Sequence, residues 1–198
     1  MTGSVLDARR SPLGELADEL AAIGGTDTVT FVERPFRVQV ELRVRPGTGA
    51  NLVDVLGMPL PDRVGEVAAT GSRHALCLGP EWWLVTDEPE REPRLECALA
   101  GDLRAAGGDA VSAVDVSVQR TTIDVAGPYA RDVLAHGCSL DLHPRVFGPG
   151  MCAGTQLAKA QVVLQQLDEA PTLRVLVRAS FAEYLGRWLL DAATEYVS

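Results

Sequence analysis

The stretch Asp115–Cys138, DVSVQRTTIDVAGPYARDVLAHGC, contains a strand, a tight turn and a helix with no linker between them. In the β-branched run Arg120–Val125, Thr121 and Ile123 alternate with Thr122 and Asp124, which predicts a strand with one dry and one wet face. Gly127-Pro128 ends that strand, because proline suits the first turn of a helix and glycine is a tolerable cap. The following apolar helix face closes at Gly137. Since this unit begins near the middle of the chain, it predicts two halves.

Bulk composition supports ordinary globular burial. The chain has 198 residues, 46% of them hydrophobic, and a net charge of -9. This charge has the wrong sign for a surface that neutralises phosphates, so nucleic acid is excluded as an expected partner. No apolar run approaches the roughly 20 residues that span a bilayer. The start of the chain lacks the apolar region of a signal peptide. We therefore expect a cytoplasmic protein that does not bind membranes.

Periodicity and turn residues predict the remaining elements. In the first half these are a helix from Ser11 (N-cap) to Gly24, strand material over 29–44 interrupted at Pro35, a short helix over 51–57, a hairpin of 73–78 and 82–86, a helix over 95–106 and a strand over 111–118. In the second half they are strands over 120–125, 155–167 and 172–178, a helix over 128–136, and a long final helix with a Ser180–Glu183 capping box. The first helix is expected to pack on its own domain or to reach a neighbouring subunit.

The two halves resemble each other in the order of their elements. Each short helix carries Asp-Val-Leu, at 54–56 and again 78 residues later at 132–134. The predicted fold is α+β, with tandem β-α-β-β-α units in one domain, in halves of about 25–115 and 116–198. We expect their strands to join into one sheet system with helices on the outer faces.

Residues suited to catalysis or metal binding do not form a recognisable pattern. The four cysteines include no C-x-x-C pair and are interpreted as buried free thiols. His136 next to Cys138 resembles a base beside a thiol, but a histidine in the last helical turn already has a structural explanation. Gly47-Thr48-Gly49 lacks the third glycine of a dinucleotide fingerprint and is interpreted as a turn. We therefore predict no catalytic, cofactor-binding or metal-binding residue in this chain.

Five residues are candidates for interface or structural roles: Trp82, Trp83, Arg120, Phe181 and Trp188. Adjacent strand residues face opposite sides, so either one tryptophan is in the core and the other is half covered by a loop, or one is a contact aromatic. Arg120 is interpreted as an ion-pair anchor to Asp115 or as an interface contact. Five residues apart on a strand, the two would need a bend to pair.

Four longer segments, together with Ser11-Pro12-Leu13, resemble the gamma subunit family of heterotetrameric sarcosine oxidase. They are LGPEWWLV at 78–85, DVSVQRTTIDVAGPYARDVLAHGCSLDL at 115–142, FGPGMCAGTQLAKAQVVL at 147–164 and VRASFAEYLGRWLLDAATEY at 177–196. The resemblance covers nearly the whole chain, although 24–69 matches only in pattern.

The resemblance implies an assembly of alpha, beta, gamma and delta subunits. Such an assembly oxidises sarcosine with oxygen to glycine and hydrogen peroxide and, with tetrahydrofolate, forms methylenetetrahydrofolate. FAD, FMN, NAD and zinc are expected in the other subunits. The gamma chain of the family is similar in fold to the folate-binding region of glycine-cleavage aminomethyltransferase, but none of that enzyme's active-site residues can be matched here.

Two functional hypotheses follow from different classes. The first is a non-catalytic subunit that assembles or stabilises the flavoenzyme. The alternative is a stand-alone folate-binding or aminomethyltransferase-like protein, for which the expected fold alone is weak support.

Overall fold

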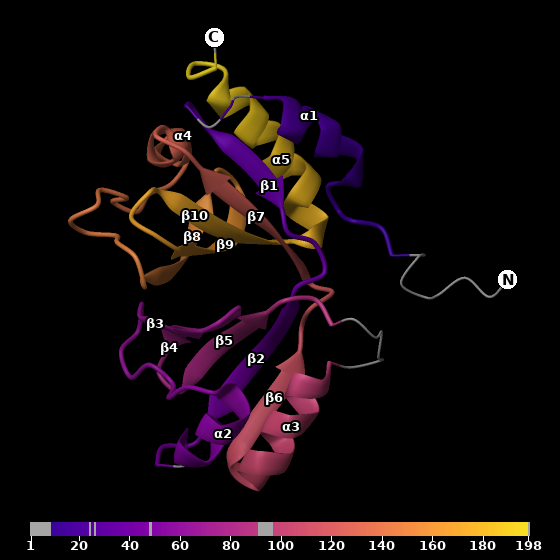
Figure 1. Cartoon of the computed structure of the whole chain (residues 1–198), viewed down its shortest axis with the longest axis vertical. Helices are drawn as coiled ribbons and strands as arrows, with labels where there is room; N and C mark the ends of the chain where they lie inside the picture. Colours follow the sequence, from indigo (N-terminus) through magenta and orange to yellow (C-terminus); the bar gives the residue numbers. More distant parts are fainter. Residues whose placement is uncertain (1–8, 24, 26, 48, 91–96, 198) are drawn as a thin grey trace, which may run out of the picture. The chain divides into compact units, whose positions relative to one another are not determined.

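The computed structural model describes residues 9–23, 25, 27–47, 49–90 and 97–197 (Figure 1). These residues divide into two compact units. Unit 1 contains residues 9–10 and Phe36–Ser117, and unit 2 combines Ser11–Pro35 with Val118–Ser198. The predicted helix end at Gly24 and helix start at Leu95 lie outside the described residues.

Unit 1 is a five-stranded antiparallel sheet in the order β3-β4-β5-β2-β6, with its helices packed against one face. Its elements are β2 (Val38–Val44), η3 (Gly49–Leu52), α2 (Val53–Leu56), β3 (Val67–Thr70), β4 (Arg73–Gly79), β5 (Trp82–Asp87), α3 (Ala98–Gly107), η4 (Gly108–Ala110) and β6 (Val111–Asp115). The apolar side chains that alternate along β2 lie on the core, as expected for a period of two.

The opposite side of the β2 region carries polar side chains, yet two of them are buried. Gln39 is fully buried and Arg37 is only 4% exposed. Arg37 is neutralised there by Glu88, with Nη1 lying 2.5 Å from Oε1. A polar residue at an alternating position can therefore be buried when a partner compensates its charge.

The β4–β5 hairpin forms as predicted, and Pro80-Glu81 is its loop. Proline lacks a backbone donor and suits a turn, while Glu81 adopts a φ of 57° that only a few non-glycine residues accept. This tight connection places Trp82 and Trp83 at the very start of β5.

Unit 2 is also a five-stranded antiparallel sheet, in the order β1-β7-β10-β9-β8. Its elements are η2 (Gly14–Leu16), α1 (Ala17–Ala22), β1 (Thr30–Glu33), β7 (Arg120–Ala126), α4 (Ala130–Ala135), β8 (Cys152–Leu157), β9 (Ala160–Gln166), β10 (Thr172–Arg178) and α5 (Ala179–Ala193). Leu13, Leu16 and Leu20 are buried in its core, so the first helix packs on its own unit.

The tandem repeat is visible in the strand order of the sheets. β7, β8, β9 and β10 occupy the places that β2, β3, β4 and β5 occupy in unit 1. The remaining position is filled by β6 in unit 1 and by the N-terminal β1 in unit 2, where β1 pairs with β7. The fold is therefore the predicted α+β class, but the strands form two separate ladders rather than one joined sheet. In each unit the repeated elements contribute four strands, and one further strand, β6 in unit 1 or β1 in unit 2, completes the sheet.

Two predicted helix caps are wrong. α5 begins at Ala179 with Arg178 at the N-cap, so Ser180 lies inside the first turn and Glu183 pairs with Arg187 instead. The first helix begins after Ser11, whose Oγ accepts the N–H of Leu13 at 3.1 Å in a preceding turn.

Two predictions for the strands of unit 2 also need correction. The expected strand over 155–167 is a hairpin, because Ala158 adopts a φ of 51° and reverses the chain without the glycine or asparagine that signals such turns. β7 is buried on both faces, whereas a wet face was expected.

Gly127 serves as a close-approach residue rather than as a helix cap. Its φ is 115°, and a Cβ at this position would lie 2.5 Å from the carbonyl oxygen of Thr28. α4 begins three residues later, at Ala130. None of the described helices is long and apolar enough to cross a membrane.

Candidate functional site

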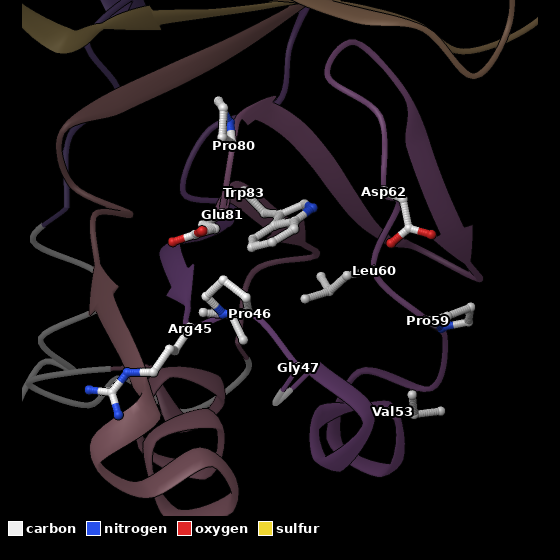
Figure 2. A pocket seen from close by; sticks show the side chains of 11 residues that line it. Arg45, Pro46, Gly47, Val53, Pro59, Leu60, Asp62, Pro80, Glu81 and Trp83 are labelled. Carbon is white, nitrogen blue, oxygen red and sulfur yellow. The ribbon is translucent and has the colours of Figure 1, made fainter.

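A cavity of about 640 Å³ opens on unit 1 beside the start of β5 (Figure 2). Trp83 lies at its centre, and three prolines, Pro46, Pro59 and Pro80, contribute to its walls. Leu60 adds a half-buried apolar side chain. We call this feature the Trp83 cavity. Proline fixes its own φ, so the backbone is restricted at these three wall positions.

Trp83 is held in one orientation. Its indole Nε1–H donates to the carbonyl oxygen of Pro61 at 2.9 Å, and its ring packs against the core of unit 1 while remaining half-buried. The donor of the indole is therefore already satisfied, and the remaining surface that the ring offers to the cavity is apolar.

Trp82 is also half-buried but has a different contact. The guanidinium carbon of Arg43 lies 4.9 Å from its ring centroid, within the range of a cation–π interaction. The two adjacent tryptophans thus differ in environment, as expected for successive strand residues, and neither is fully buried.

The rim of the Trp83 cavity carries charge. Asp62, Glu81 and Arg45 line it, and all three are exposed. Among the described residues, neither Asp62 nor Glu81 forms an ion pair. Figure 2 shows the two carboxylates on opposite sides of the Trp83 ring, with the Arg45 guanidinium extending away from it.

Arg120 and Asp115 lie in different units, at the start of β7 and the end of β6. The Asp115 carboxylate accepts the backbone N–H of Cys97 at 2.7 Å and both the N–H and the hydroxyl of Ser117. Burial acts to raise the pKa of Asp115, but these hydrogen bonds outweigh it and hold the pKa below its ordinary value. Asp115 therefore secures the start of α3. The interface role considered for Arg120 stays a prediction.

Phe181 and Trp188 lie on α5 but differ in exposure. Phe181 is 42% exposed, whereas Trp188 packs against the unit 2 core. The ring of Trp188 covers Gly137 so closely that a Cβ there would lie 2.7 Å from Cζ2. Trp188 is therefore part of the packing of unit 2, while an interface role for Phe181 stays a prediction.

Unit 2 contains a buried ion cluster that was not predicted from the sequence. Arg174 donates from Nε and Nη2 to the two carboxylate oxygens of Asp124, at 2.7 and 2.9 Å, and each residue is 7% exposed. Arg34 adds a third bond, with Nε 3.1 Å from Oδ2. Arg174 and Asp124 lie directly opposite on paired strands, so charge at matching positions of β7 and β10 was the available signal.

Arg131 organises the loop that contains Phe147–Gly150. Its guanidinium donates to the carbonyl oxygens of Leu142 and Phe147 and to Oε1 of Gln166. Burial lowers the pKa of Arg131. This arginine therefore ties the loop to α4 and β9.

Cys77 and Cys97 are buried, and His136 lies at the end of α4. Burial raises the pKa of Cys97 to about 12 and also raises that of Cys77, which disfavours the reactive thiolates. His136 Nε2 lies 2.9 Å from the Tyr196 hydroxyl at the exposed end of α4. Within the described part of the chain, no three His, Cys, Asp or Glu side chains are grouped to hold a metal ion.

Comparisons with known proteins agree along almost the whole chain. The family model "Sarcosine oxidase, gamma subunit family" matches residues 43–195. The sarcosine oxidase gamma subunit of Arthrobacter sp. is 39% identical over 194 residues, covering 96% of this chain and 92% of the relative. That of Corynebacterium sp. strain U-96 is 40% identical over 193 residues, covering 95% and 91%.

Solved structures extend the agreement to the fold. A chain of the heterotetrameric sarcosine oxidase from Corynebacterium sp. U-96 is 38% identical, with a TM-score of 0.86 over 96% of this chain and 97% of that chain. Glycine cleavage system aminomethyltransferase T from Bartonella henselae shares the fold at 14% identity, with a TM-score of 0.61 over 90% of this chain and 56% of that chain. The chain belongs to the sarcosine oxidase gamma subunit family.

Proposed function

We propose that this chain is a non-catalytic subunit that assembles and stabilises a heterotetrameric sarcosine oxidase. The observation that carries the proposal is the end-to-end match, at a TM-score of 0.86, to a chain of a heterotetrameric sarcosine oxidase. In this proposal the partners are alpha, beta and delta subunits in the cytoplasm. The assembly converts sarcosine to glycine and hydrogen peroxide and, with tetrahydrofolate, yields methylenetetrahydrofolate. The other subunits hold its flavins, nicotinamide cofactor and zinc.

The structural use of buried polar groups supports a non-catalytic role. Asp124 is engaged by two arginines, Asp115 secures a helix start, and Arg131 holds a loop. Catalytic acids and nucleophiles need an accessible group whose pKa suits the reaction. The Cys97 thiol, with its pKa raised to about 12, has the opposite property.

Co-expression of the four chains tests the proposal. We expect this chain to co-purify with the three partners in a flavin-containing complex that produces peroxide from sarcosine. Omission of this chain should lower the yield and thermal stability of the remaining complex. Recovery of this chain alone, with a complete active complex forming without it, would contradict the proposal.

Substitutions of His136 and Cys138, a possible base and thiol close together in the sequence, test the proposal that this chain is non-catalytic. His136→Ala and Cys138→Ser should leave kcat per flavin within about twofold of the parent once the complex has assembled. A large loss of kcat in an intact complex would show that this chain takes part in the chemistry.

Titration of the isolated chain with a reduced folate, followed by tryptophan fluorescence, tests the stand-alone alternative. Saturable binding would favour that alternative.

A further inference from the structure

The Trp83 cavity has the anatomy of a protein-docking site. Its floor is apolar, with Trp83 and Leu60 half-buried, while its charged groups are confined to the exposed rim. Protein interfaces have this arrangement, with a desolvated apolar centre surrounded by a polar rim.

The polar groups of the cavity fit a small-molecule site less well. Such sites, of roughly 300–1,000 Å³, orient their ligand with a few convergent polar groups inside the pocket. Here the Trp83 indole N–H already donates to the carbonyl oxygen of Pro61. The volume admits a small ligand, but the described walls offer little to fix its orientation.

The charges at the rim indicate the chemistry of the occupant. Asp62 and Glu81 lie on opposite sides of the Trp83 ring, and neither has an ion-pair partner among the described residues (Figure 2). A segment that crosses the ring therefore passes a carboxylate on each side. A lysine or arginine can lay its aliphatic stem on the indole and present its cation to a carboxylate. The chain's net charge of -9 also favours a basic partner surface.

We infer that the Trp83 cavity is the docking pocket for a partner subunit of the oxidase, and that it receives a segment with an apolar side chain flanked by lysine or arginine. This inference rests on the proposed function, which supplies the partner. The prolines with their fixed φ and the hydrogen-bonded Trp83 lower the cost of ordering these residues on binding. Tryptophan is also enriched among the residues that dominate binding energy.

The test is a competition for incorporation into the complete complex. Differently tagged parent and variant chains are co-expressed in equal amounts with the three partner subunits, and their ratio in the purified complex is measured by mass spectrometry. The double variant Asp62→Lys/Glu81→Lys reverses the rim charge. Leu60→Glu introduces a charge into the apolar floor.

We expect the rim variant to enter the complex about tenfold less often than the parent, with the deficit decreasing at high salt because rim charges are screened. Leu60→Glu should be excluded about 100-fold, since it buries an unpaired charge. Two matched controls lie outside the cavity lining. Asp102→Lys makes the same change on the exposed side of α3, and Val64→Glu makes it at a side chain that is 59% exposed. Both should enter at the parental level, and thermal unfolding of the isolated variants checks that each is folded.

The outcomes separate the two proposals. If the parent enters no complex, the proposed function fails and this inference fails with it. If the parent enters but the folded rim and floor variants enter equally well, only the docking pocket is overturned. Self-association of the isolated parent that the same substitutions abolish would assign the cavity to a second copy of this chain and would also overturn the partner-subunit assignment.

Discussion

The two units share a strand order but cover their sheets differently. Unit 2 places the 15-residue α5 and the additional helix α1 against its sheet, and both contribute to its core. In unit 1 the corresponding helix α3 has 10 residues and η3–α2 is short, and the Trp83 cavity opens at the start of β5. The same strand order therefore occurs with a larger helical cover in unit 2 and with an open cavity in unit 1.

In each unit, one face of the sheet is turned away from these helices, and this face also differs between the units. In unit 2 this face carries the Asp124–Arg174 pair, in which both residues are buried. In unit 1 Gln39 lies opposite Thr86 on the corresponding strands, and the ion pair of the buried Arg37 is with the exposed Glu88. A buried ion pair is sensitive to loss of one partner, while neutral polar residues are less so. The units should respond unequally to matched substitutions.

The largest difference is expected for Asp124→Asn in unit 2. The substitution leaves Arg174 buried without its bidentate partner, so we expect the free energy of unfolding to fall by about 3–5 kcal/mol. Chemical denaturation measures this value. The control in unit 1 is Glu41→Gln, which removes a partly exposed carboxylate 3.8 Å from Arg43 and should cost less than about 1 kcal/mol. Equal losses at the two positions would show that the unit 2 pair has no special role.

A smaller difference is expected between two glycines that follow equivalent strands. Gly47→Ala and Gly127→Ala both place a side chain at positive φ, which costs about 1–2 kcal/mol. At Gly127 the new Cβ also meets the Thr28 oxygen at 2.5 Å, whereas Gly47 has open space. Gly127→Ala should therefore cost about 1–3 kcal/mol more, by analogy with overpacking. Similar midpoints in thermal unfolding for the two variants would rule out the close-contact explanation.

The two tryptophans of unit 1 provide a finer test. Trp83→Phe removes the donor to Pro61 and should cost about 1 kcal/mol. Within the described structure, Trp82 Nε1 is buried without a hydrogen-bond partner, so Trp82→Phe should change stability by less than about 0.5 kcal/mol. Urea denaturation of both variants measures the difference, and a larger cost at Trp82 would contradict the assigned contacts.

The smallest effect concerns the Cys97 thiol of unit 1. Its pKa is raised from 9.0 to about 12, so only about one molecule in ten thousand carries the thiolate at pH 8. Labelling with iodoacetamide should therefore be slow at Cys97 and should accelerate on unfolding. Cys138 of unit 2, which is less buried, serves as the internal reference.

The same shift has a defined pH dependence. The unfolded thiol releases its proton from about pH 9.0, while the folded protein retains it up to about pH 12, so the folded state binds more protons within this window. Stability from Cys97 is therefore unchanged below pH 9 and falls as the pH rises toward 12. The stability of the parent relative to Cys97→Ala should decrease over that range, and a constant difference would contradict the assignment.

Elements were predicted correctly from the sequence where the local pattern and the tertiary structure agree. Alternation along β2 and the apolar stripe of α5 predicted both elements, and the Pro80-Glu81 turn predicted the hairpin before Trp82. The predictions were wrong at the Ser180 cap and at Ala158. At the start of α5, the N–H of Ala179 donates to the carbonyl oxygen of Gln119, a residue distant in the sequence. At Ala158, the turn is made by a residue type that is not typical of such turns.

The sequence by itself was sufficient to predict the α+β class, the tandem repeat and the family resemblance, because these depend on periodicity and on long matching segments. Only the tertiary structure decided that β1 completes the sheet of unit 2, that Asp124 meets Arg174, and that Trp83 lies in a cavity. Each of these features joins residues that are distant in the chain. Such contacts depend on how strands pair and how far the helices extend over a sheet. Local sequence patterns predict neither the pairing nor the extent of the helices.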